Sequence, residues 1–261
     1  MTPIQAAILG LLQGLTEFLP ISSSGHLVFG QRLLGIESGD ITFEVVVHFG
    51  TLLAVVTALR QRVLDLAAGC LRRQPDAWRF VLLLGIGTIP AATFGLMFRD
   101  AFEGVFSNPV AVAALLIVTG VILWSTRFKS GDRKELWVKD VVWIGLSQAL
   151  AILPGISRSG ITIGTGIWRG INAREAATFS FLLSIPVIAG ANALKGAEMI
   201  ANPPSAETVV PLLAGMLTAY VSGVVAIKWL LAVLERGRLD MFAYYCWTVG
   251  LIGVVAFSAQ G

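Results

Sequence analysis

Four side chains in two short polar stretches have the chemistry needed to act on a phosphate. The stretch "EFLPISSSGH" contains Glu17, Ser23 and His26, and the later stretch "PGISRSG" contains Arg158. A carboxylate and an imidazole can move protons, and a serine hydroxyl can act as a nucleophile. The forked guanidinium group of arginine suits a phosphate. The pattern indicates a site for an anion, beside groups able to attack it.

Small and hydroxyl-bearing residues surround these side chains in both stretches. A loop rich in serine and glycine that opens a helix offers hydroxyls and backbone N–H groups to an anion, and the helix N-terminus adds the positive end of its dipole. The residues that we expect to bind an anionic substrate in this way are Ser22, Ser24, Gly25, Ser157, Ser159 and Gly160.

The composition places these polar stretches in a membrane protein. The chain has 261 residues, of which 56% are hydrophobic and 13% charged, whereas soluble domains carry about 25% charged residues. A helix needs about 20 mainly apolar residues to span a bilayer. Six segments meet this requirement and predict transmembrane helices at residues 42–59, 80–98, 109–126, 176–195, 209–233 and 242–258.

Two further apolar stretches, 2–35 and 138–170, are interrupted in the middle by Pro, Gly and Ser. Backbone with unpaired N–H groups is tolerated at membrane depth only where it is buried in protein or lines a watery cavity. We therefore expect each stretch to form a re-entrant helical hairpin with its polar turn near the middle of the protein. The predicted fold class is an all-α polytopic membrane protein with two such hairpins and about six transmembrane helices.

The charges of the loops predict the orientation of the chain. Arginine and lysine gather in the loops 60–79 and 127–140 and in "LERGRLD", whereas the loop 99–108 has only Arg99 and "EMIANPPSAE" has neither. Because basic loops stay in the cytoplasm, both termini are expected on the outer face. A net charge of +3, distributed in this way, excludes a nucleic-acid-binding surface.

The two polar stretches align with each other without gaps. The segment "QGLTEFLPISSSG", from Gln13, lies over "QALAILPGISRSG", from Gln148. Three spans follow each copy, and an odd number inverts the second copy relative to the first. The sequence therefore predicts an inverted-topology repeat within one membrane domain, with repeat 1 at residues 1–126 and repeat 2 at residues 127–261. The two copies do not carry the same polar side chains, because the second copy has Ile152 where the first has Glu17.

Other residues are expected to have supporting roles. Glu44 and His48 in "FEVVVHFGT" are four residues apart and share one helix face, so we expect them to pack or to support the site. Cys70 and Cys246 lie far apart without a CxxC pattern, and we expect packed thiols.

The stretches "QGLTEFLPISSSGH" and "PGISRSG" resemble the two signatures of the bacterial undecaprenyl-diphosphate phosphatase family of the bacitracin-resistance type, and the similarity runs the length of the chain. The resemblance implies removal of one phosphate from the C55 isoprenyl diphosphate carrier of cell-wall synthesis, a polyprenyl diphosphate lipid. The reaction would take place at the outer, periplasmic face of the bacterial inner membrane.

By position, the resemblance implies that Glu17, Ser23, His26 and Arg158 form the catalytic centre. It places Gln13 in substrate binding, where other family members have Glu. It also implies a divalent cation, Mg or Ca, with Glu17 as the candidate ligand. A homodimer is compatible with this assignment.

Two mechanisms and one other function fit the same residues. Ser23 or a water could attack the terminal phosphorus while His26, oriented by Glu17, moves the proton; alternatively, His26 could attack and form a phosphohistidine. A transporter or flippase of a lipid phosphate would use the same inverted repeat without hydrolysis. The sequence does not fit the other large class of membrane lipid phosphatases. The Lys-x6-Arg-Pro motif of that class is missing, and its Ser-Arg-x5-His motif would require His where this chain has Gly164.

Overall fold

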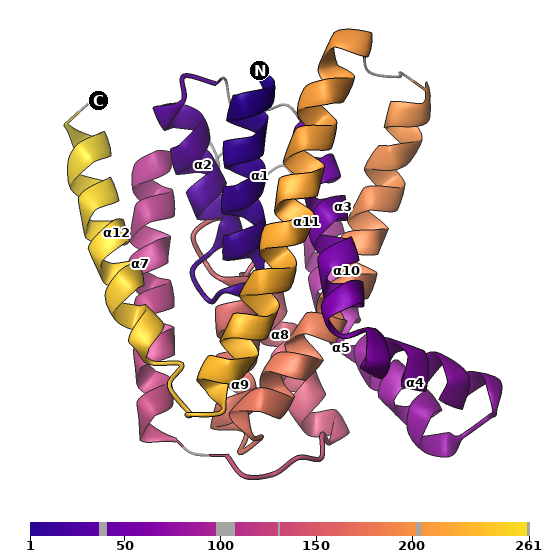
Figure 1. Ribbon diagram of the computed structural model, residues 1–261. Coiled ribbons are helices and arrows are strands. Elements are labelled where there is room, and N and C mark those ends of the chain that lie inside the picture. Colours follow the sequence, from indigo (N-terminus) through magenta and orange to yellow (C-terminus); the bar gives the residue numbers. More distant parts are fainter. Residues whose placement is uncertain (37–40, 98–107, 130, 202–204, 260–261) are drawn as a thin grey trace.

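The fold is helical throughout the part of the chain that the structure describes. This computed structural model describes residues 1–36, 41–97, 108–129, 131–201 and 205–259. Within these ranges the regular structure consists of helices and one isolated bridge between Arg133 and Ile171. Figure 1 shows long helices standing side by side, with the N-terminus and the end of the last helix at the same end of the molecule. The predicted all-α fold class is confirmed.

Five helices are each long and apolar enough to cross a membrane: α5 (Pro75–Met97), α7 (Pro109–Ser125), α10 (Ala173–Ala201), α11 (Ala206–Leu234) and α12 (Met241–Ser258). A sixth candidate combines α3 (Ile41–Ala58) with α4 (Arg60–Leu71), which is bent away from it by 78°. The prediction of about six transmembrane helices is confirmed for the described residues. Residues 99–107 of the predicted outer loop lie outside them.

Two pairs of shorter helices occupy the two broken stretches. α1 (Pro3–Phe18) is followed by α2 (Ser23–Leu33), and α8 (Val138–Leu150) by α9 (Arg158–Trp168). At about 1.5 Å per residue, α2 and α9 are each about 17 Å long, too short for a hydrocarbon layer of about 30 Å. Figure 1 shows α1 and α2 in the half with the N-terminus, and α8 and α9 in the opposite half. The symmetry that would relate residues 1–126 to 127–261 stays a prediction.

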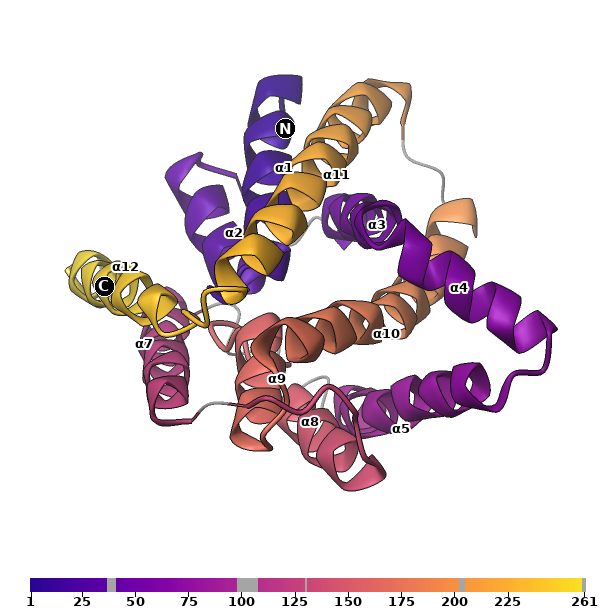
Figure 2. The same cartoon turned by 60° about the horizontal axis from the view of Figure 1, so that its bottom comes forward.

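The basic segments of the chain lie together at one end. Figure 1 shows α4, the 3-10 turn η1 (Thr126–Phe128) and the connection between α11 and α12 at the end opposite to the N-terminus. Figure 2, which brings that end forward, shows α9 and α10 near the centre, with α7 and α12 on one side and α4 and α5 on the other. The grouping agrees with the alternation of loop charges in the sequence.

Capping residues and prolines fix the ends of the first hairpin. Thr2 and Gln5 form a capping box at the start of α1, where Pro3 occupies the first turn. Pro20 disfavours helical backbone at Leu19, which is extended at φ −67° and ψ 145°. The helix therefore ends at Phe18, and Glu17 falls in its last turn.

Glycines allow α1 to pack closely against α11. A Cβ atom added to Gly10 would lie 2.1 Å from the Gly215 carbonyl oxygen, and one added to Gly14 would lie 2.1 Å from the Ser222 hydroxyl. Small residues spaced by four let two helix backbones approach in a membrane. This contact sets the depth at which α1 presents Glu17.

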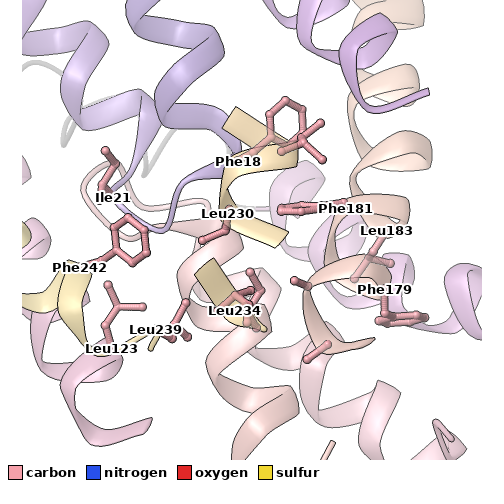
Figure 3. Close-up of a cluster of buried hydrophobic side chains, with 14 of the residues drawn as sticks. Phe18, Ile21, Leu123, Phe179, Phe181, Leu183, Leu230, Leu234, Leu239 and Phe242 are labelled. Carbon is pink, nitrogen blue, oxygen red and sulfur yellow. The ribbon is translucent and has the colours of Figure 1, made fainter. Parts of the chain in front are cut away.

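Aromatic packing holds the end of the same helix. Phe18 is fully buried, and its ring meets that of Phe181 on α10 edge to face, with centroids 5.6 Å apart and planes at 88°. Figure 3 shows both rings in a cluster with Leu230 and Leu234 of α11. The turn after α1 is therefore anchored to two transmembrane helices.

A buried carboxylate closes the base of the second hairpin. Asp140, at the start of α8, is fully buried. Its carboxylate oxygens lie 2.7 Å from Arg133 Nη2 and 3.0 Å from Arg169 Nε. Because Arg169 follows the last residue of α9, this cluster ties the two arms of the hairpin together.

The contact between α1 and α11 yields a test of the packing. We expect Gly14→Leu to lower the free energy of unfolding by at least about 1–3 kcal/mol, because its side chain must displace α11. Gly85→Leu on α5 is the matched control, since no atom lies within 4 Å of an added Cβ there. Thermal unfolding in detergent measures both. Equal stability of the two variants would contradict the packing argument.

Candidate active site

Glu17 is the centre of a buried hydrogen-bond network. Its Oε2 accepts from the Ser23 hydroxyl at 2.6 Å and from Gln13 Nε2 at 3.0 Å. Its Oε1 accepts from Arg158 Nη2 at 2.6 Å. The side chains of Glu17 and Arg158 are 8% and 15% exposed, so this ion pair is shielded from water. The pair joins the end of α1 to the start of α9.

The turns of the two hairpins also satisfy each other's backbone. The Gly155 N–H donates to the Ser22 hydroxyl oxygen at 3.2 Å, and the Ser159 hydroxyl donates to the Leu19 carbonyl at 2.9 Å. Thr119 on α7 stabilises the second turn, donating to the Gly155 carbonyl and accepting from the Ser157 N–H. The backbone N–H and carbonyl groups named here are therefore all hydrogen-bonded.

Two backbone conformations fix the turns. Ser22 has a φ of +67°, which is uncommon outside glycine, and its hydroxyl caps α2 by accepting from the Gly25 N–H. Gly155 has a φ of +101°, and a Cβ there would lie 2.3 Å from the Val112 carbonyl oxygen, so only glycine fits. Strain of this kind persists where the surrounding contacts are strong, and it is common at functional sites.

Some of the predicted anion-binding groups serve the turns instead. The Gly25 and Gly160 N–H groups donate to the capping hydroxyls of Ser22 and Ser157. An α-helix leaves its first N–H groups without partners inside the helix. At the two tips these are the N–H groups of Ser23 and Ser24 on α2 and of Arg158 and Ser159 on α9.

A cavity of about 240 Å³ lies where the hairpin tips meet. Its polar lining comes from α1, α2, α3 and the α8–α9 turn with the start of α9: Glu17, Ser22, Ser23, Ser24, Glu44, His48, Ser157 and Arg158. Three of the four residues predicted to be catalytic, Glu17, Ser23 and Arg158, therefore share one cavity, and Glu17 contacts the other two.

His26 lies elsewhere. Its Nδ1 lies 2.8 Å from the Ser22 carbonyl, and its Nε2 lies 2.9 Å from the Tyr245 hydroxyl on α12, against which the imidazole ring stacks. The cavity lining does not include it. The prediction that Glu17 orients His26 is wrong, because spacing across a turn does not determine which face of α2 a side chain occupies.

Glu44 and His48 line the cavity, although the sequence indicated only packing or support for them. His48 Nδ1 donates to the Glu44 carbonyl at 2.7 Å, which turns Nε2 toward Glu17 Oε2, 3.8 Å away. Ionisable residues inside a membrane segment are functional candidates by default. Their occurrence four residues apart in an otherwise apolar segment was the available signal.

The two aligned glutamines have different surroundings. Gln13 donates to Glu17, whereas Gln148 Nε2 donates to the Gly87 carbonyl at 3.1 Å on α5. The Oε1 atom of each is buried without a hydrogen-bond partner among the described residues. Gln13 does not line the cavity, so its contact with the site is the hydrogen bond that it donates to Glu17.

The described residues include no cluster of three His, Cys, Asp or Glu side chains that could enclose a metal ion. The cavity does contain two carboxylates, Glu17 and Glu44. Mg²⁺ is commonly held by one or two carboxylates together with substrate phosphates and water. The residues therefore fit a cation that shares its ligands with a phosphate substrate, and do not form a closed cage.

The fold and the site together define an integral membrane protein in which two hairpins of short helices bring a serine, a carboxylate and an arginine into one polar cavity. The chain belongs to the bacitracin resistance protein BacA family, whose model matches residues 6–252. The resemblance carried by the two signatures is confirmed.

Curated relatives match over nearly their whole length. A protein of Carboxydothermus hydrogenoformans is 41% identical, covering 100% of this chain and 99% of its own. Proteins of Halothermothrix orenii and Methanobrevibacter smithii are 40% and 42% identical, covering 98% and 97% of this chain and 98% and 96% of their own. Each of the three is named undecaprenyl-diphosphatase.

The ion pair between Glu17 and Arg158 yields a test of its role in stability. Arg158→Met leaves the buried carboxylate unpaired and should destabilise the protein by about 3–5 kcal/mol. Adding Glu17→Gln should recover much of this loss, because no charge then remains buried. Thermal unfolding in detergent provides the measurement.

The exposed pair formed by Arg174 and Glu235 is the control, since both side chains are about half exposed. Arg174→Met should cost less than about 1 kcal/mol. A double variant at Glu17 and Arg158 that is less stable than Arg158→Met alone would contradict the argument.

Proposed function

We propose that this chain is an integral membrane phosphatase that hydrolyses undecaprenyl diphosphate to undecaprenyl phosphate and inorganic phosphate. The reaction recycles the lipid carrier of cell-wall synthesis and confers bacitracin resistance. The observation that carries the proposal is the 2.6 Å hydrogen bond from the Ser23 hydroxyl to the buried Glu17 carboxylate, in a cavity that Arg158 also lines.

Ser23 is the nucleophile in this proposal. Its oxygen attacks the terminal phosphorus while Glu17 Oε2 accepts its proton, and the bond from phosphorus to the bridging oxygen breaks. Undecaprenyl phosphate leaves, and a phosphoserine remains. Water then attacks the phosphorus of the phosphoserine, the bond from phosphorus to the Ser23 oxygen breaks as Glu17 returns its proton to that oxygen, and phosphate is released. The position of His26 outside the cavity supports Ser23 over a histidine nucleophile.

Fixed donors bind the diphosphate. The first N–H groups of α2 and α9 carry the positive ends of two helix dipoles, and both helices begin at the cavity. Arg158 adds a permanent positive charge, and it is held by Glu17 and by the Ser180 carbonyl, 3.3 Å from Nη1. Groups held in place before the substrate arrives need no reorganisation as charge develops in the transition state.

A divalent cation, Mg or Ca, remains part of the proposal. When bound, it would offset negative charge on the diphosphate oxygens. Glu17 and Glu44 are the carboxylates that would hold it, because both line the cavity. The homodimer stays a prediction.

The nucleophile can be tested with variants of neighbouring residues. Ser23→Ala should lower kcat for phosphate release from undecaprenyl diphosphate by at least about 10³-fold. Ser24→Ala, which removes a hydroxyl from the same cavity, should retain most activity, as should His26→Gln. A phosphate that is stable to acid should be trapped on the wild-type protein at Ser23.

Three results would contradict this assignment. An inactive His26→Gln variant together with trapped phosphate labile to acid would make His26 the nucleophile. Full activity of Ser23→Ala would remove Ser23 from the chemistry. Transport of a lipid phosphate by wild-type protein that releases no phosphate would favour the transporter instead.

The active site opens toward the periplasmic side of the bacterial inner membrane in this proposal. The concentration of basic residues at the end opposite to the N-terminus supports this orientation. α1 and α2 enter from the other end, which is then the outer one.

Cysteine labelling tests the orientation. In a Cys70→Ser background, Ser205→Cys should react with an impermeant thiol reagent added to intact spheroplasts, because Ser205 is exposed at the outer end. Lys129→Cys, exposed at the basic end, should react only after the membrane is permeabilised. The reverse pattern would invert the proposed orientation.

A further inference from the structure

α4 turns away from the membrane-spanning helices. It begins directly after α3, with Leu59 as the single residue between them, and it is bent from α3 by 78°. At about 1.5 Å per residue, the 18 residues of α3 reach about 27 Å, close to the thickness of the hydrocarbon layer, so α3 can span without α4. Figure 1 shows α4 pointing away from the upright helices, and Figure 2 shows its connection to α5 at the periphery of the molecule.

The exposed side of α4 is amphipathic. Leu64 and Leu71 are 62% and 86% exposed, and together with Ala67 they form an apolar stripe on one face of the helix. Asp65 and Arg72, which are also exposed, form a polar stripe beside it. A helix with this division of side chains lies in the plane of the membrane surface, with its apolar face among the acyl chains.

Apolar side chains are exposed at the start of α5 as well. Trp78 and Leu82 are 49% and 63% exposed. The Trp78 indole N–H donates to the Cys70 carbonyl at 3.2 Å, and a Cβ added to Gly69 would lie 2.7 Å from the Cβ of Ala77. α4 and the first turns of α5 are therefore packed closely as one unit. Tryptophan is enriched where a membrane meets water, which agrees with a surface position for this unit.

The charge of this unit is positive. We call residues 60–82 the α4–α5 arm, which has five arginines and two aspartates. Arg60, Arg72 and Arg73 are exposed, and the ion pairs among the described residues do not include them. Exposed arginines beside an apolar stripe attract the head groups of anionic lipids.

We infer that the α4–α5 arm is a membrane-surface anchor. Its apolar stripe inserts among the acyl chains, and its exposed arginines bind the head groups of anionic phospholipids. With the orientation proposed above, these lipids belong to the cytoplasmic leaflet. The anchor binds lipids of the surrounding bilayer rather than the substrate, so it goes beyond the proposed phosphatase activity and can be tested without measuring turnover.

Spin labels test the position of the arm. In full-length protein carrying Cys70→Ser, with the buried Cys246 retained, Leu71→Cys and the control Asp65→Cys are each spin-labelled in phosphatidylglycerol nanodiscs. The ratio of collisions with oxygen, which dissolves in hydrocarbon, to collisions with a water-soluble nickel chelate should be at least about threefold higher at position 71 than at position 65.

Two results of this measurement would overturn the inference. Equal ratios at the two positions would show that the apolar stripe faces water. A label at position 71 that neither reagent reaches would show that protein covers the stripe, as in a complex with a second copy of the chain.

Brominated lipids test the preference for anionic head groups. A bimane label at Leu71→Cys is measured in nanodiscs of phosphatidylglycerol and phosphatidylcholine in equal amounts, with bromine on the acyl chains of one lipid or the other. Quenching should be at least about twofold stronger when phosphatidylglycerol carries the bromine. Arg72→Gln together with Arg73→Gln should remove this difference, whereas Arg127→Gln, exposed in η1, should retain it. Equal quenching by the two lipids, or a difference that persists without Arg72 and Arg73, would overturn the binding of anionic head groups by these arginines.

Discussion

The buried ion pair between Glu17 and Arg158 is the interaction on which the structure of the site depends. Each charge would be costly inside a membrane protein without the other, and their residues lie in different halves of the chain. The pair therefore forms only when both hairpins have reached their final positions. Its formation also aligns Ser23, which shares the same carboxylate. The contact that joins the two hairpins therefore also positions the Ser23 hydroxyl.

The cost of burying unpaired polar groups also explains why the two hairpins occur together. A turn at membrane depth exposes backbone groups that hydrocarbon cannot satisfy. Here the groups of one turn are paired with hydroxyls and carbonyls of the other, as at Ser22 with Gly155 and Ser159 with Leu19. The close packing of Gly10 and Gly14 against α11 brings α1 to the depth where these bonds form. Neither tip could be stable alone in the bilayer.

The two hairpin tips contribute different side chains to the site. Both tips contribute capping serines and helix N-termini, but only the first contributes Glu17 and Ser23, and only the second contributes Arg158. α3 adds Glu44 and His48 from outside both hairpins. The result is a cavity in which a serine hydroxyl, a carboxylate and a guanidinium group lie side by side.

The sequence by itself determined the membrane class and the two interrupted segments, because hydropathy and local motifs depend on residues near one another in the chain. It predicted the grouping of Arg158 with Glu17 and Ser23 only through the gapless alignment of the two segments and their resemblance to one family. Only the tertiary structure decided the places of His26, Glu44 and His48. Which side of α2 meets Tyr245, and which side of α3 meets the hairpin tips, depends on how the helices rotate as they pack. That rotation is set by contacts between distant segments, so no local pattern records it.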